Sequence, residues 1–248
     1  MTTPGGVASN VADIDEKAIR REVPEELVMA LAHAKATAVR ARLAASPPRL
    51  PALPALLITS DQVVVHNGRI LEKPADAAEA RAFLRGYGSA PARTCGAICV
   101  TNLATGAVAA ALDAAAVHFM PLPADVIEAL IAEGSVFACA GGLMVEHPRV
   151  APFVTRLEGG MDSVLGLSKA LTLTLLLRAA GEGEDAARRA AEAAAAAWAA
   201  AAEGEQAAAW TPRSAGGGRS RCRCCCATLL CQTRSRQRAP GRQRRILR

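Results

Sequence analysis

A chain builds its core from apolar residues that recur at helix or strand spacing. In this sequence such residues end near residue 180. From Gly181 the segment GEGEDAARRAAEAAAAAWAAAAEGEQAAAW is almost entirely Ala and Glu, which favour a helix but offer little area to bury. The Arg-, Cys- and Gly-rich segment after residue 210 has no periodic apolar face. We therefore expect one folded domain over residues 9–180, a solitary Ala/Glu-rich helix over 181–210 and a disordered basic tail over 211–248.

The net charge of +6 is distributed unevenly. Residues 211–248 hold 11 of the 29 basic side chains and no acidic one, so the rest of the chain is acidic. Such a tail can attract nucleic acid through its charge, but no aromatic residue follows Trp210 to stack on bases. Nucleic-acid binding is therefore not expected beyond non-specific contacts of the tail.

The sequence also indicates in which cellular compartment the protein is expected. No stretch of about 18 apolar residues is free of charge, so no membrane-spanning helix is predicted. The N-terminal segment MTTPGGVASNVADIDEK lacks the basic and then apolar pattern of a secretory signal. Cys95, Cys99 and Cys139 lie in apolar contexts, typical of small buried residues in a reduced protein. We expect a cytoplasmic protein.

Helix and strand patterns alternate along residues 25–180, which indicates an α/β domain. The Pro-rich stretch over 46–54 predicts a loop, and Asn67-Gly68 predicts a tight turn. Asp76 with Glu79 three residues later has capping-box spacing. The expected helices cover 25–43, 76–86, 123–134 and 167–180, and the expected strands cover 56–59, 63–66 and 93–119, the last range with a turn at 102–106.

Four charged residues stand at the ends of these elements or within them. Glu16 follows an acidic segment, Lys35 lies within the first helix, Asp61 separates two apolar runs and Lys73 precedes a proline. A carboxylate held by strands can bind a divalent metal, and lysines can neutralise phosphate oxygens. Each residue alone is more often a surface charge or a turn residue than part of a catalytic site. Together they favour phosphoryl chemistry.

The segment TSDQVVVHNGRILEKPADAAEARAFLRGYG, which contains Asp61, resembles the signature of the Maf family of nucleotide pyrophosphatases. Further matches follow in the same order along residues 10–180: the Asp15-Glu16 pair, Lys35 in AHAKA, CAGGLMVE and GGMDSVLGL. The resemblance implies a mixed sheet flanked by helices with a central cleft. It also implies a hydrolase that cleaves nucleoside triphosphates between the α and β phosphates, with Mg²⁺ or Mn²⁺ as cofactor.

Roles for individual residues follow from the same resemblance. Asp61 would accept a proton from the attacking water and, with Glu16, would hold the metal. Lys35 and Lys73 would bind phosphate. Ser60-Asp61-Gln62 and Glu146 resemble the subgroup that acts on 7-methyl-GTP rather than on dTTP and UTP, so Gln62 and Glu146 would bind the substrate base. The alternative is that Glu146 only caps a loop.

One family motif has no counterpart here. No Ser-x-Ser-x-Arg-Arg loop precedes Asp13, so the first strand and its phosphate-binding loop are expected to be lacking. We expect attenuated hydrolysis of 7-methyl-GTP or a related nucleotide. The alternative is a catalytically inactive, truncated isoform that acts, if at all, as a binding protein. The expected partner is a small nucleotide, and the sequence leaves a homodimer open.

Overall fold

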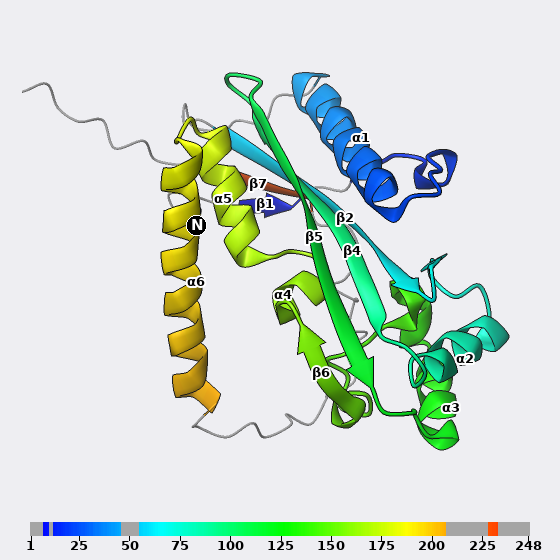
Figure 1. The fold of residues 1–248 in the computed structure, drawn as a ribbon. Helices are drawn as coiled ribbons and strands as arrows, with labels where there is room; N and C mark the ends of the chain where they lie inside the picture. The colour runs from blue at the N-terminus through cyan, green and yellow to red at the C-terminus, as the bar shows by residue number, and fades with distance from the viewer. Residues whose placement is uncertain (1–6, 10–11, 46–54, 207–227, 233–248) are drawn as a thin grey trace, which may run out of the picture.

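Three long antiparallel strands form the centre of the fold in the computed structural model, which describes residues 7–9, 12–45, 55–206 and 228–232. These strands are β2 (Ala55–His66), β4 (Ala92–Asn102) and β5 (Val108–Phe119). The full order across the sheet is β1 (Val7–Ser9), β7 (Thr228–Gln232), β2, β4, β5 and β6 (Val154–Glu158), and β3 (Arg69–Leu71) also pairs with β2. Figure 1 shows helices on both sides of these strands. The expected α/β fold is confirmed.

β2 is one continuous strand, whereas the sequence predicts two short strands with Asp61 between them. Asp61 lies within the ladder, opposite Ala97 of β4. The polar residues of β2 do not interrupt it because they find partners on a neighbouring helix. Thr59, for example, is fully buried and donates its hydroxyl to the carbonyl oxygen of Ala32 at 2.8 Å.

Every strand pairing in the described residues is antiparallel, which corrects the expectation of a mixed sheet. Tight turns account for two of these pairings, because the chain reverses directly between β2 and β3 and between β4 and β5. The first turn is the predicted Asn67-Gly68 hairpin, in which both residues have positive φ, 49° and 74°. In the second, the side-chain oxygen of Asn102 accepts hydrogen bonds from the amides of Ala104 and Thr105.

A helix covers each face of the sheet. On one face, α1 (Pro24–Ala45) buries apolar residues such as Leu31 against the odd-numbered side chains of β2 and β4. On the other face, α5 (Lys169–Ala179) packs Leu175 against Ile98 and neighbouring residues. The proline-rich loop predicted over 46–54 lies outside the described residues.

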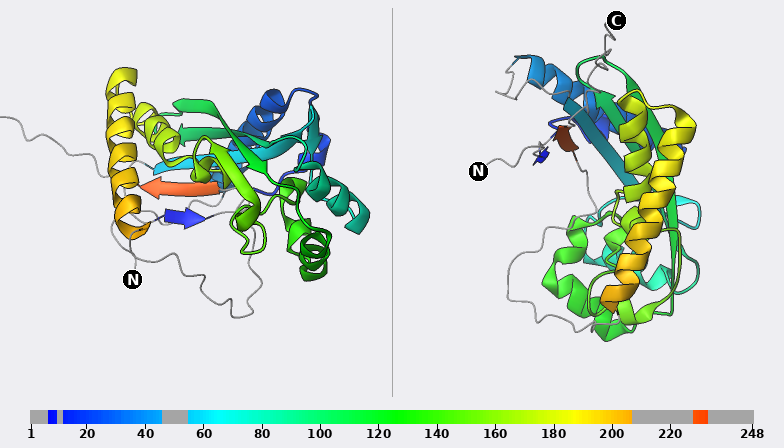
Figure 2. Two further views of the ribbon diagram at one scale, coloured as in Figure 1. Left: turned by 60° about the horizontal axis from the view of Figure 1, so that its bottom comes forward. Right: turned by 90° about the vertical axis from the view of Figure 1, so that its left-hand side faces the viewer.

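The Ala-rich segment forms α6 (Glu184–Gln206), as predicted, but it is not solitary. Figure 2 shows α6 beside α5, on the side of α5 that faces away from the sheet. Ala187 and Ala191 are buried, since a surface of small side chains lets two helices approach closely. Within the described residues, no helix is long and apolar enough to span a bilayer.

A second helical layer lies beyond the end of the sheet and contains α2 (Ala77–Gly86) and α3 (Ala124–Glu133). As the capping-box spacing predicts, Asp76 accepts from the amide of Glu79, but Glu79 in return accepts from the amide of Ala75, one residue before the N-cap. The remaining short elements follow α3: η2 (Ser135–Ala138), η3 (Ala140–Gly142), η4 (Ala151–Phe153), β6 (Val154–Glu158) and α4 (Met161–Val164).

Tyr87 joins this layer to the sheet. Its hydroxyl donates to the carbonyl oxygen of Gly141 at 2.6 Å, and its ring stacks on Phe119. Burial raises the pKa of Tyr87, because the low-dielectric interior disfavours the phenolate. Gly141 has φ +62° and sits against Val64 and Tyr87, so the turn requires a glycine there.

A strand that the sequence does not predict lies beside β2, second from one edge of the sheet. Most of the tail expected to be disordered, 211–248, lies outside the described residues, but Thr228–Gln232 form β7. β7 pairs with residues 55–59 of β2 and, on its other side, with β1 (Val7–Ser9). The tail therefore contributes a strand to the sheet.

One cysteine also differs from expectation. Cys95 and Cys99 are free and buried, as predicted, and burial raises the pKa of the Cys95 thiol to about 11. Cys139, predicted to be reduced, is disulfide-bonded. Its apolar context indicated burial but carries no information about a distant cysteine.

The pairing of β7 with β2 generates the first prediction. A chain ending at residue 227 loses β7, whereas a chain ending at residue 232 keeps it. We expect the shorter chain to melt several degrees lower, since each kcal/mol lost corresponds to roughly 2–4 °C in a chain of this size. Amides of residues 55–59 should also exchange faster with solvent. Equal melting temperatures, measured with a thiol reductant present, would contradict the pairing.

The second prediction concerns the turn at Gly141. In Gly141→Ala a Cβ would meet the Tyr87 hydroxyl and lie 3.0 Å from a Val64 methyl carbon, in addition to the strain of positive φ. Gly134→Ala is the matched control, because Gly134 has φ +78° and nothing within 4 Å. Denaturant unfolding should show a loss of about 1–2 kcal/mol for the control and a further loss of about 1–3 kcal/mol for Gly141→Ala. Equal losses would mean that the close packing is unimportant.

Candidate active site

Lys35 is a lysine inside the protein, with only 1% of its side chain exposed. It lies on the buried face of α1, and its ammonium group reaches β2, where it forms an ion pair and hydrogen bond with Asp61. The same nitrogen lies 3.0 Å from a carboxylate oxygen of Glu16. A buried charge requires such partners, because removing it from water without compensation costs several kcal/mol.

The two carboxylates reach Lys35 from different elements and differ in exposure. Asp61 is buried, since its side chain points from β2 toward α1. The Glu16 side chain is 46% exposed and belongs to η1 (Glu16–Ala18). Asp15 caps that short helix by accepting from the amide of Lys17 at 3.1 Å. Glu16 is thus held at the solvent side of the buried ion pair.

A cavity of about 440 Å³ opens beside this pair. Its volume falls within the range of small-molecule sites, roughly 300–1,000 Å³. Leu27 and Leu31 of α1 supply apolar wall, and Lys73 lines it from the loop between β3 and α2. The charged lining residues are Glu16, Lys17, Arg20, Asp61, Glu72 and Lys73. Three cations and three carboxylates therefore line one cavity, a combination that suits a polyanion bound together with a metal ion.

The loop that contributes Lys73 is fixed to the turn at Gly141. The amide of Gly141 donates to the carbonyl oxygen of Glu72 at 2.8 Å, and Ala140 also lines the cavity. The Ala-Gly motif seen in the sequence is thus part of the site through its backbone. The sequence analysis missed Lys17, Arg20 and Glu72, although two consecutive arginines at 20–21, shortly after Glu16, were visible.

Gln62 has a different orientation from Asp61. It contributes to the cavity wall, but its side-chain amide donates to the carbonyl oxygen of Ser163 at 2.7 Å. The Ser163 hydroxyl donates to Asp113 of β5 at 3.1 Å. Burial raises the pKa of Asp113. Because neighbouring strand residues face opposite sides, the Gln62 amide and the Asp61 carboxylate lie on different faces of β2.

Glu146 lies away from the buried ion pair. It is exposed in the loop after η3 and, among the described residues, is not one of those that line the cavity. The same loop is attached to α3 by Glu133, which contacts His147 at 2.9 Å and Arg149 at 3.0 Å. The structure thus brings Glu16, Lys35, Asp61 and Lys73 together but leaves Glu146 apart from them.

Glu16 and Asp61 are the carboxylates that fit a divalent cation. In the part of the chain that the structure describes, no three or more His, Cys, Asp or Glu side chains are placed so that they could hold a metal ion together. Mg²⁺ does not need such a group, since it commonly binds through one or two carboxylates, substrate phosphates and water. The donor set therefore suits a metal that arrives with a nucleotide.

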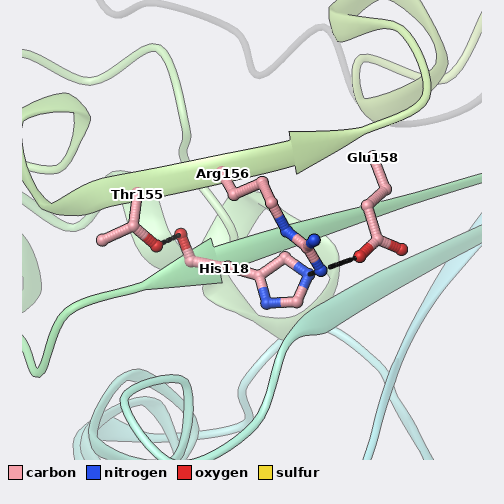
Figure 3. Close-up of polar contacts among 4 residues, drawn as sticks. All are labelled: His118, Thr155, Arg156 and Glu158. Atoms are coloured by element: carbon pink, nitrogen blue, oxygen red, sulfur yellow. Dashed lines mark hydrogen bonds and ion pairs between the residues drawn. The ribbon is translucent and has the colours of Figure 1, made fainter.

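A second polar cluster joins β5 to β6 and is shown in Figure 3. His118 contacts Glu158 at 2.9 Å, and Arg156 forms an ion pair with the same carboxylate. The hydrogen bond from His118, followed by the charge of Arg156, lowers the pKa of Glu158. Thr155 donates to the backbone oxygen of His118 at 3.1 Å. His118 is thus engaged within the sheet through both its side chain and its backbone.

The sequence of this chain is similar to those of known proteins over most of the folded domain. A 7-methyl-GTP pyrophosphatase from Dictyostelium discoideum is 41% identical over 163 residues, which cover 66% of this chain and 81% of that protein. A dTTP/UTP pyrophosphatase from Burkholderia thailandensis is 35% identical, covering 63% and 72%. A nucleoside triphosphate pyrophosphatase from Streptomyces coelicolor is 34% identical, covering 65% and 74%.

A family model described as Maf-like protein matches residues 3–179, which contain every element of the cavity. The resemblance found in the sequence is therefore confirmed. This chain belongs to the Maf-like protein family.

Proposed function

We propose that this chain is a nucleoside triphosphate pyrophosphatase that hydrolyses 7-methyl-GTP or a related modified nucleotide to the monophosphate and pyrophosphate. The observation that carries the proposal is the convergence of Glu16 and Asp61 on the buried ammonium of Lys35, beside a cavity also lined by Lys73. The activities named for the relatives support it.

The proposed reaction begins with water in the cavity. Asp61 accepts a proton as the water oxygen attacks the α phosphorus, and the bond between that phosphorus and the bridging oxygen breaks. Pyrophosphate leaves with the bonding electrons. Lys35 holds Asp61 in position and compensates its charge, while Lys73 neutralises phosphate oxygens as negative charge develops.

Glu16 and Asp61 are the residues that would hold Mg²⁺ or Mn²⁺. Such an ion would neutralise phosphate charge and polarise the phosphoryl group. Glu16 is suited to this because its carboxylate is half exposed at the cavity, where an ion bound to substrate phosphates would enter.

The choice of nucleotide is the finer part of the proposal. The sequence identity is higher to the 7-methyl-GTP pyrophosphatase than to the dTTP/UTP enzyme, 41% against 35%. Glu146 is the carboxylate proposed to recognise the positively charged methylated base, and this role rests on the sequence pattern alone. Attenuated turnover, a cytoplasmic location and a homodimer stay predictions from the sequence.

The third prediction tests the proton acceptor. Asp61→Asn keeps the size of the side chain but removes its basicity, so pyrophosphate release from 7-methyl-GTP should fall by about 10²–10⁴-fold. The assay measures pyrophosphate with Mg²⁺ or Mn²⁺, against the wild type and against Asp125→Asn on α3 as a control of the same chemistry outside the cavity. Unchanged release in Asp61→Asn would exclude this mechanism. No release from any triphosphate by the folded wild type would favour the binding-protein alternative.

The fourth prediction tests specificity. Glu146→Gln removes the proposed partner of the methylated base, so the ratio of kcat/KM for 7-methyl-GTP to that for dTTP should drop about tenfold or more. Glu133→Gln loosens the same loop without touching Glu146 and serves as the matched control. If both variants lose activity equally toward all nucleotides, Glu146 supports only the loop. An unchanged ratio would also contradict the specificity role.

A further inference from the structure

A second cavity, of about 410 Å³, adjoins the one beside Asp61. The two share part of their walls, since Arg20, Leu27, Leu71, Glu72, Lys73 and Ala75 line both. The second cavity adds Arg21 and Arg69, so four cationic side chains line it against two carboxylates, Glu72 and Glu79. Its lining is therefore net positive, whereas that of the first cavity is balanced.

Glu79 is already engaged in local structure. One of its carboxylate oxygens accepts from the backbone amide of Ala75 at 2.7 Å as part of the capping box of α2. The carboxylate that opposes the arginines directly is that of Glu72, which lies 2.6 Å from a guanidinium nitrogen of Arg20. This contact stands on the boundary that both cavities share.

The contact between Arg20 and Glu72 is suited to exchange. Both side chains are more than half exposed, at 55% and 58%. Exposed ion pairs contribute only about 0–1 kcal/mol, so a more highly charged anion can displace the carboxylate. The structure gives this pair one short contact, whereas a phosphate group can accept two hydrogen bonds from a guanidinium and carries more charge.

We propose that this second cavity binds the β and γ phosphates of the substrate and the pyrophosphate product, with Arg20 exchanging Glu72 for a phosphate oxygen. The inference rests on the proposed function, because it assigns the first cavity to the nucleoside and α phosphate. Lys73, which lines both cavities, stands at the junction where the scissile bond would lie.

The two partners of the ion pair give opposite expectations. If Arg20 binds phosphate, Arg20→Gln weakens pyrophosphate binding, whereas Glu72→Gln removes a competitor and strengthens it. If the pair only holds the loop between β3 and α2, both variants weaken binding alike. Arg81→Gln is the matched control, since the Arg81 side chain forms a two-point contact with Glu128 between α2 and α3, outside both cavities.

The experiment is calorimetric titration of the full chain with inorganic pyrophosphate in excess Mg²⁺, and in parallel with 7-methyl-GMP. We expect Arg20→Gln to weaken pyrophosphate binding about tenfold or more, Glu72→Gln to tighten it and Arg81→Gln to leave it unchanged. Arg20→Gln should weaken binding of 7-methyl-GMP much less than binding of pyrophosphate, because Arg20 lines both cavities but the monophosphate has no β or γ phosphate to place in the second.

The outcomes separate this inference from the proposed function. The inference is overturned if Arg20→Gln binds pyrophosphate as tightly as the wild type does. It is also overturned if Arg20→Gln and Glu72→Gln weaken pyrophosphate binding equally. Both conclusions hold even if the wild type hydrolyses 7-methyl-GTP. Loss of pyrophosphate binding in Arg20→Gln, in a protein that hydrolyses no nucleotide, would support the anion site while the proposed function fails.

Discussion

The buried ammonium of Lys35 is the interaction on which the arrangement of the cavity depends. Its charge would cost several kcal/mol if it were left alone inside the protein. The compensating carboxylates come from Asp61 in β2 and Glu16 in η1, so packing α1 against the sheet also brings these two oxygen donors together. Burial of one lysine thus links the stability of this region to the position of the groups proposed for catalysis.

Local signals in the sequence were sufficient for most helices and turns. The capping box at Asp76, the hairpin at Asn67-Gly68 and the glycine end of α3 at Gly134 each depend on residues within one turn of chain. The continuity of β2, in contrast, depends on residues far away in the sequence. Thr59 and Asp61 are accepted in the middle of a buried strand because Ala32 and Lys35 of α1 bind them, and no local pattern reveals contacts 26 or 27 residues apart.

The candidate site was predictable in its residues but less so in its geometry. Glu16, Lys35, Asp61 and Lys73 could be named from the sequence. Glu16, Asp61 and Lys73 line one cavity, and Lys35 contacts the two carboxylates from inside the protein. Strand alternation already implies that Asp61 and Gln62 face opposite ways, and the Gln62 amide indeed binds the backbone of Ser163. The contribution of Arg20 depends on the fold of the short segment between η1 and α1, which has no periodic pattern to interpret.

The edge of β2 explains why the cavity lies where it does. β7 pairs with residues 55–59 on this edge and β3 pairs with residues 64–66, and in the described parts of the chain neither strand reaches residues 60–63 between them. The cavity is lined at that interval, by Asp61, Gln62 and Val63. An unbroken partner strand would occupy the space that a substrate needs. The division of this edge between two short strands therefore leaves the middle of a buried strand accessible, so a carboxylate there can be shielded from bulk water and still meet a ligand.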